Sequence, residues 1–189
     1  SGSAGTPVTM EIEGIGAPTT VTGDVFVLSS STIGGFIGTS RISGRVVDTN
    51  GTSTITFANG RGSGTSFNLQ LGSVSGPNYW GDTIIDPDLS GGIFTVTAMT
   101  PNAISTNGLT LGAHGNFALN GNDHTVGKLQ STAAGGAVLH NHATTAAVLT
   151  IGADATSTAF DGAFGNGGAA ALGVTKIGAG TLALSGSSS

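Results

Sequence analysis

The chain has 189 residues, 34 of them glycine, with only 8% charged residues and a net charge of −5. A hydrophobic content of 38% excludes the low-hydrophobicity, high-charge class of disordered chains, so the abundant glycine indicates an ordered protein with many tight turns. Five basic residues are too few for a surface that binds nucleic acid or an anionic membrane. No apolar run reaches the roughly 20 residues of a membrane helix. The absence of cysteine excludes disulfides, zinc-thiolate sites and thiol nucleophiles.

Short alternating segments, rather than helices, follow one another along the chain. In residues 8–13, Val8 begins an apolar face, and Glu11 and Glu13 lie on the opposite face. Further alternating or apolar runs lie at 67–71, 93–99, 109–111, 117–119, 126–129, 148–151, 172–177 and 182–184. Glycine and asparagine turns are expected at 50–51, 107–108, 120–122 and 166–168.

Strands at intervals of 8–12 residues are typical of either a β-sandwich or a β-solenoid. The runs are very short, the turn chemistry recurs and small residues are plentiful, so we expect an all-β chain folded as a parallel β-helix (β-solenoid). A β-sandwich is the alternative. With about 20 residues in a coil and coils about 4.8 Å apart, the rod would be roughly 40–45 Å long.

Interior stacks of Val, Ile, Leu and Phe are expected to stabilise such a rod. Leu182 and Leu184 are expected to face inward, so changing either one to Asp would bury an unpaired charge and unfold this region.

One turn-and-strand unit occurs twice. Residues 176–186 read Lys-Ile-Gly-Ala-Gly-Thr-Leu-Ala-Leu-Ser-Gly, and a fainter copy lies at 61–65 and 69–72. Repetition of this kind, in a chain with so few charges, indicates a stacked β-architecture. Such proteins usually act as extended surfaces.

The C-terminal segment at 176–186 also resembles part of a known family. Residues 104–186 resemble the passenger-associated repeat of autotransporters, which also occurs in large secreted proteins of other bacteria with double membranes. The most specific positions are Lys176, Gly178, Gly180, Thr181, Leu182, Leu184 and Gly186. The order of segments in the family is followed by residues 109–112, 117–122, 125–129, 147–152 and 160–164. Two further segments match the family loosely, at 42–46 and 78–84.

The resemblance implies a right-handed parallel β-helix that is secreted or on the surface of a bacterium with a double membrane. Residues 42–189 would form a β-solenoid with autotransporter-type repeats. Residues 1–41 depart from the pattern and would form an N-terminal cap or interaction segment of the same solenoid. We expect a non-catalytic structural protein, a building block of a surface fibre or filament. The alternatives are the adhesive passenger domain of an autotransporter and a polysaccharide-active β-helix enzyme.

The family pattern would begin another unit after residues 187–189. A solenoid that stops there presents an unpaired strand edge, and no Pro- or Lys-rich segment blunts it. We therefore expect end-to-end self-association. Glycans, or the surface of a host or neighbouring cell, are the other expected partners. Because the sequence begins at Ser1 rather than Met, we expect a processed or excised piece.

Tyr79 and Trp80 are the only tyrosine and tryptophan, and they are adjacent. Neighbouring aromatic rings can anchor a subunit interface or stack on a sugar, so both residues are candidates for an interface. The alternative is that one ring packs inside the coil.

Four histidines lie close together in the sequence: His114, His124, His140 and His142. The spacing of His140 and His142 puts two imidazoles on one strand face, which can bind a metal. The sequence specifies no third ligand, so a solvent-facing or stacked role is the alternative, and no metal site is predicted.

Asp82, Asp86 and Asp88 form an acidic cluster that could bind calcium, which takes 6–8 oxygen ligands. The glycine-rich nonapeptide of calcium-binding β-helices is missing, so an ordinary turn at Pro87 is favoured.

Polysaccharide hydrolysis needs two carboxylates that face one groove. The pair formed by Glu11 and Glu13 is more typical of a solvated strand face. The sequence shows no evident catalytic partner for Asp123, His124 or Asp154. The glycine-rich triplets lead into strands, whereas nucleophile elbows and phosphate-binding loops lead into helices. We therefore expect no catalytic residues, no enzymatic activity and no cofactor.

Overall fold

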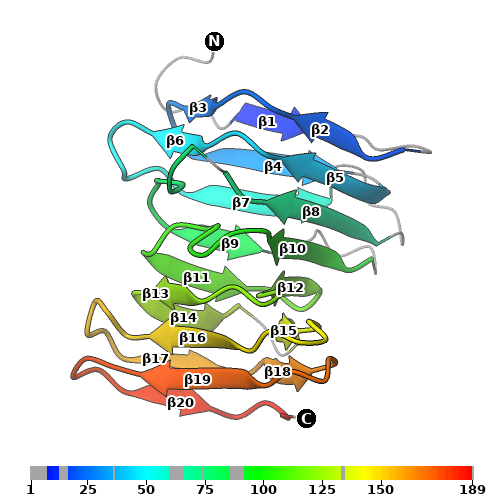
Figure 1. The fold of residues 1–189 in the computed structure, drawn as a ribbon. Coiled ribbons are helices and arrows are strands. Elements are labelled where there is room, and N and C mark those ends of the chain that lie inside the picture. The colour runs from blue at the N-terminus through cyan, green and yellow to red at the C-terminus, as the bar shows by residue number, and fades with distance from the viewer. Residues whose placement is uncertain are drawn as a thin grey trace.

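The computed structural model describes residues 8–12, 17–35, 37–59, 66–73, 75–85, 92–132 and 135–188. Within those ranges every regular element is a β-strand, and the parallel sheets stack as a β-solenoid of about six turns (Figure 1). Every ladder between the described strands is parallel. The predicted β-solenoid is confirmed, and the sandwich alternative is wrong.

Most coils contain three strands, and strands pair with their counterparts in the neighbouring coils. The first sheet runs β1 (Val8–Glu11), β4 (Ser31–Gly35), β7 (Ile55–Asn59), β9 (Thr83–Ile85), β11 (Gly108–Leu111) and β14 (Lys128–Ser131). The second sheet runs β2 (Thr19–Val21), β5 (Gly38–Ile42), β8 (Phe67–Leu71), β10 (Phe94–Ala98), β12 (Gly115–Ala118), β15 (Ala137–His140) and β18 (Ala163–Asn166). The coils that begin with β7 and β9 contain two strands each.

The third face consists of two shorter sheets. One pairs β3 (Val25–Val27) with β6 (Val46–Asp48), and the other runs β13 (His124–Val126), β16 (Ala147–Ile151) and β19 (Leu172–Lys176). The remaining pair, β17 (Thr158–Phe160) with β20 (Leu182–Leu184), continues the first sheet past β14. There the Thr158 hydroxyl donates to the Leu129 carbonyl at 2.7 Å.

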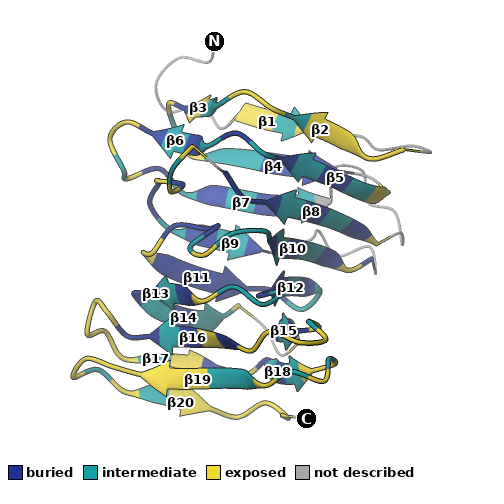
Figure 2. Cartoon of the chain, in the orientation of Figure 1, coloured by how far each residue is buried: buried dark blue, intermediate teal, exposed yellow. Residues whose placement is uncertain are grey.

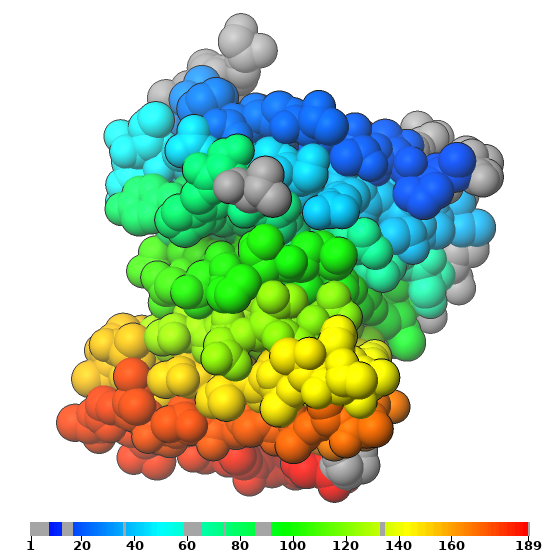
Figure 3. All heavy atoms as spheres, viewed as in Figure 1, coloured from blue at the N-terminus to red at the C-terminus, as the bar shows by residue number. Residues whose placement is uncertain are grey.

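The coils are longer than the sequence predicted. On the first sheet Leu109 pairs with Leu129, whereas Ile55 pairs with Thr83, so a turn takes about 20 to 28 residues. Longer coils mean fewer coils for the same number of residues, so at about 4.8 Å per coil the rod is shorter than the expected 40–45 Å. Figure 3 shows the coils following one another as bands in chain order.

The interior is built by strict alternation along each strand. In β8, Phe67, Leu69 and Leu71 are buried, while Asn68 and Gln70 are half-exposed on the outer face, as the sequence predicted (Figure 2). The same alternation buries alternate residues of β10, beginning at Phe94. Because pairing is in register, like residues stack from coil to coil, and the Phe67 and Phe94 rings lie 5.3 Å apart.

Two of the predicted turns require left-handed backbone. Gly51 has a φ of 66°, and the Asn120–Gly121 turn places both residues at positive φ, 49° and 79°. At a third predicted turn, the chain bends at Asn107, but Gly108 already begins β11, so the expected turn at 107–108 is only partly correct.

The C-terminal segment at 176–186 forms a turn followed by a strand. Lys176 ends β19, Gly178 turns with a φ of 68°, and β20 follows. A Cβ at Gly180 or Gly186 would collide with a carbonyl oxygen of the preceding coil, so these glycines allow the coils to stack closely. The fainter copy at 61–65 lies outside the described residues.

The N-terminal segment belongs to the same sheets as the rest of the chain. Strands β1 and β2 pair with β4 and β5, and β3 pairs with β6. The expected boundary at residues 41 and 42 falls inside β5, where the ladder with β8 is continuous. The cap role of residues 1–41 stays a prediction.

Asp48 holds one of the loops between coils. Its buried carboxylate accepts backbone N–H bonds from Asn50, Thr52 and Ser53 at 2.9, 2.8 and 2.7 Å. Burial by itself would raise the pKa of Asp48, but these donors hold the pKa below its ordinary value.

Asp48→Asn should lower the free energy of unfolding by about 1–3 kcal/mol, because the amide N–H2 of Asn would face backbone N–H donors and leave them unsatisfied. Denaturant titration at pH 7 measures this change. Asp154→Asn is the matched control, since the Asp154 carboxylate accepts from Thr156 in an exposed turn. Equal effects of the two substitutions would contradict the role of burial.

Candidate functional site

Exposed large apolar side chains concentrate at the two ends of the solenoid. Six of the ten among the described residues lie there: Val8, Phe26 and Leu28 at the N-terminal end, and Val174, Ile177 and Leu184 at the C-terminal end. The other four, Ile37, Tyr79, Ile93 and Val148, lie between the ends. Figure 2 shows the middle coils mostly buried or half-buried, with exposed strands gathered in the first and last coils. The ends are therefore the strongest candidates for contact surfaces.

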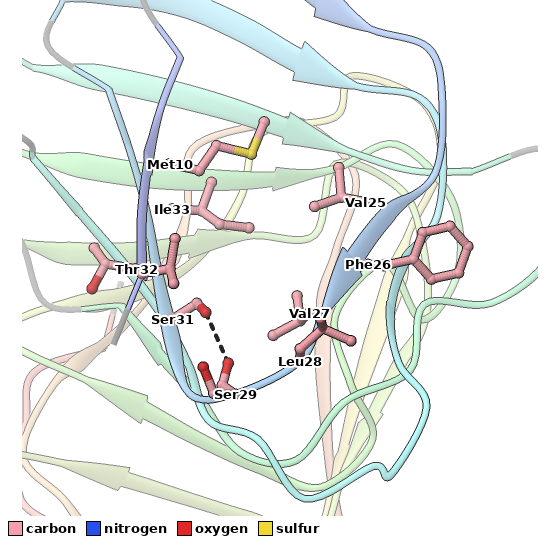
Figure 4. A pocket seen from close by; sticks show the side chains of 10 residues that line it. Met10, Val25, Phe26, Val27, Leu28, Ser29, Ser31, Thr32 and Ile33 are labelled. Carbon is pink, nitrogen blue, oxygen red and sulfur yellow. Dashed lines mark hydrogen bonds between the residues drawn. The ribbon is translucent and has the colours of Figure 1, made fainter. Parts of the chain in front are cut away.

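A cavity of about 250 Å³ lies between β1, β3 and β4 at the N-terminal end. Figure 4 shows Met10, Val25, Val27 and Ile33 directed into it, while Phe26 points away. Of its described lining residues, three are polar: Ser29, Ser31 and Thr32. The Ser31 hydroxyl already donates to the Ser29 carbonyl at 2.8 Å. The cavity therefore suits an apolar occupant.

The sequence analysis predicted an apolar face beginning at Val8 but missed β3. The apolar run at 25–28 was the available signal. Its alternation places Val25 and Val27 inside and Phe26 outside (Figure 4).

The C-terminal end corrects one expectation. Leu184 is aligned with the buried Phe160 of the preceding coil, yet its side chain is 55% exposed. Leu182 is only half-buried. The inward alignment is as predicted, but no described strand lies beyond β20 to cover it. Leu184→Asp would therefore bury no charge, and the expected unfolding by this substitution is wrong.

Both ends also present backbone groups. Among the described strands, β1 pairs only with β4, and β20 pairs only with β17. Edge strands carry N–H and C=O groups that can pair with another strand. Each end thus combines a strand edge with apolar side chains.

The structure separates the two aromatic residues of the predicted interface. Trp80 is fully buried, packs edge-on against Phe57 at 6.2 Å, and donates its indole N–H to the Thr83 hydroxyl at 2.9 Å. Tyr79 is 55% exposed and bridges to Val47 on the third face. Only Tyr79 is available to a partner.

His124 is a buried, neutral part of the core. Its Nε2 accepts the Ala103 backbone N–H at 2.8 Å, so Nδ1 carries the proton and donates to the Asn122 carbonyl at 3.2 Å. Its ring packs edge-on against Phe117 at 4.9 Å. Burial lowers the pKa of His124 from 6.5 to about 4, although the Asn122 carbonyl and Asp123 act in the opposite direction.

The two candidate metal ligands are not equivalent in the structure. His140 ends β15 and is buried, and its ring nitrogens have no hydrogen-bond partner among the described residues. His142 lies beyond the strand, where its Nδ1 accepts the Thr145 backbone N–H at 3.0 Å. His114 is half-exposed. In the described ranges no three His, Cys, Asp or Glu side chains gather into a metal-binding group.

The acidic candidates are only partly described. Asp82 accepts the Gly108 backbone N–H at 2.8 Å and pairs with Lys128 Nζ at 2.9 Å, so it joins neighbouring coils. Asp86, Asp88 and Glu13 lie outside the described residues. Asp123 accepts the Val148 backbone N–H at 2.8 Å, which also links two coils.

A shallow groove of about 270 Å³ lies on the second sheet, a feature that the sequence analysis missed. Its lining residues are Asn68, Thr95, Thr97, Ala118, Asn120, Leu139 and Asn141. None of them is charged, and the Thr97 hydroxyl donates to the Asn68 side-chain oxygen at 2.7 Å. The signal available in the sequence was the row of Asn and Thr at the outward positions of neighbouring strands.

The part of the chain that the structure describes contains no helix long and apolar enough to cross a membrane. No protein-family model, curated protein or solved structure matches the chain.

Proposed function

We propose that this chain is a non-catalytic structural protein, a building block that stacks end to end in an extracellular fibre or filament. We place it on the surface of a bacterium with a double membrane, or secreted from one, because the phrase at 176–186 resembles the autotransporter passenger repeat.

The observation that carries the proposal is that both ends expose apolar side chains and an edge strand. Leu184 and its exposed neighbours lie at one end, and an apolar cavity lies at the other. Both ends present edge strands of the first sheet. Contact between different surfaces of identical subunits gives open filaments unless a rotation closes it into a ring.

Leu184→Asp should abolish assembly and leave the fold intact, because the charge would lie in the contact but outside the core of the single chain. We expect the wild-type protein to sediment as concentration-dependent polymers that electron microscopy shows as fibres. We expect the variant to be monomeric at concentrations at least about tenfold higher. Val148→Asp is the matched control, since Val148 is also exposed and apolar but lies on β16, which is paired on both sides, with β13 and with β19. A wild-type protein that is a monodisperse monomer at high concentration would reject the proposal.

The groove on the second sheet favours a second candidate, an adhesive passenger module that binds uncharged glycans. Its amide and hydroxyl groups are of the kind that hydrogen-bond sugar hydroxyls. A glycan screen that compares the wild-type protein with Asn141→Ala tests this candidate, since Asn141 lines the groove and is exposed. The enzyme alternative has less support here, because no lining residue is a carboxylate and hydrolysis needs two.

A further inference from the structure

We infer that the end-to-end contact has one register, in which β1 of a second copy adds in parallel to β20 of the first. Val8 then lies over Leu182, and Met10 lies over Leu184. This inference rests on the proposed function, and it specifies which residues make the contact.

The register follows from two columns of residues that run along the first sheet. The ladders align Val8, Ser31, Ile55, Thr83, Leu109 and Leu129 in one column, and Met10, Ile33, Phe57, Ile85, Leu111 and Ser131 in the other. The columns hold inward positions, since Ile55 and Phe57, for example, are fully buried.

The last two strands continue both columns. Thr158 donates to the Leu129 carbonyl at 2.7 Å, and the Asp161 N–H donates to the Ser131 hydroxyl at 2.9 Å. Strand β17 is thus aligned with β14, with Thr158 in the first column and Phe160 in the second. Pairing of β17 with β20 then places Leu182 after Thr158 and Leu184 after Phe160.

A second copy that continues the columns therefore begins with Val8 on Leu182 and Met10 on Leu184. The Leu184 side chain, 55% exposed in the single chain, then points toward the cavity lined by Met10, Val25 and Val27. Among the described residues that line that cavity, none is charged. Contact between the two copies therefore removes the apolar surface of both ends from water, which favours association.

Slippage by one residue is unfavourable because strands alternate their faces. A shift by one residue would place the outward-facing Thr9 over the inward-facing Leu182, whose direction is fixed by the pairing of β20 with β17. In the inferred register the outward-facing Thr9 instead lies opposite Ala183. A strand parallel to β20 continues the pairing found in all the ladders of this sheet, and β1 of another copy is such a strand.

The absence of cysteine allows a direct test by cross-linking. Thr9→Cys and Ala183→Cys both change exposed side chains, so each variant should fold. Neighbouring strands lie about 4.8 Å apart, within the Cα separation that a disulfide spans. Mixing the two single-cysteine variants under mild oxidation should produce a covalent dimer between different variants.

Ala159→Cys is the matched control for Ala183→Cys. Ala159 is exposed and pairs with Ala183, so it lies one strand further from the contact. We expect Thr9→Cys to cross-link to Ala183→Cys at least about tenfold faster than to Ala159→Cys. Adding Leu184→Asp to Ala183→Cys should abolish the cross-link.

The outcomes separate the two claims. If the wild-type protein assembles but Thr9→Cys cross-links no faster to Ala183→Cys than to Ala159→Cys, the register is wrong and the proposed function stands. If the wild-type protein does not assemble, both fail. Preferential cross-linking to Ala183→Cys that Leu184→Asp abolishes supports both.

Discussion

Leu111→Asp is expected to abolish cooperative folding of the solenoid. Leu111 is fully buried in the first sheet, between Ile85 of one coil and Ser131 of the next. Truncation of a buried leucine costs about 2–5 kcal/mol, and an unpaired carboxylate in an apolar interior adds a desolvation cost. The total exceeds the range of about 0.5–3 kcal/mol that is typical of single substitutions.

Circular dichroism during thermal unfolding, together with limited proteolysis, measures the loss. Leu184→Asp is the control with the same chemical change, because the Leu184 side chain is 55% exposed. We expect the control to keep its unfolding transition within a few degrees of the wild-type value when both are monomeric. A folded Leu111→Asp variant with wild-type stability would contradict the position of the first sheet against the core.

The stability of the protein is expected to fall as the pH decreases from about 6.5 to 4, because His124 resists protonation in the native state. Its pKa is 6.5 in the unfolded chain and about 4 in the folded chain. Between those values the unfolded chain binds a proton that the native chain does not, so acid favours unfolding. The full contribution is present above pH 6.5, and about 3 kcal/mol is lost by pH 4.

His124→Gln is the variant that isolates this effect. Gln does not titrate, and its side-chain oxygen is an acceptor that can replace Nε2 as the partner of the Ala103 N–H. Denaturant titration from pH 7 to pH 4 measures the unfolding free energies of the wild-type protein and the variant. The other histidines contribute equally to both proteins, so their effect cancels in the difference. A difference that is constant across this range would show that His124 is not the group responsible.

Alternation was the part of the fold that the sequence specified best. Residues Phe67 to Leu71 alternate strictly, and burial of every second side chain follows directly from the geometry of a strand. Coil length was not predictable in the same way, because the loops between strands vary in length and do not contribute to the periodic pattern. The rod is consequently shorter than expected.

Exposure at the ends depends on what lies next to a residue in space, which the sequence pattern does not contain. Leu182 and Leu184 have the pattern of core residues, and only the stacking order shows that no described strand covers them. The same limit applies to Tyr79 and Trp80, which lie outside the named strands: Tyr79 forms an isolated bridge and is exposed, whereas Trp80 is buried. The groove combines residues from four strands and their loops, so no local motif marks it.

Each coil pairs only with the coils before and after it, and this arrangement makes the rod modular. Duplication of residues 109–128, the interval between Leu109 and its partner Leu129, would insert a coil whose strands meet neighbours like their own. Unlike the core of a compact domain, which must be redesigned when the chain grows, this interior keeps the same cross-section at any length. Evolution can therefore change the reach of such a protein by copying coils, and each added coil contributes stability through contacts with its immediate neighbours.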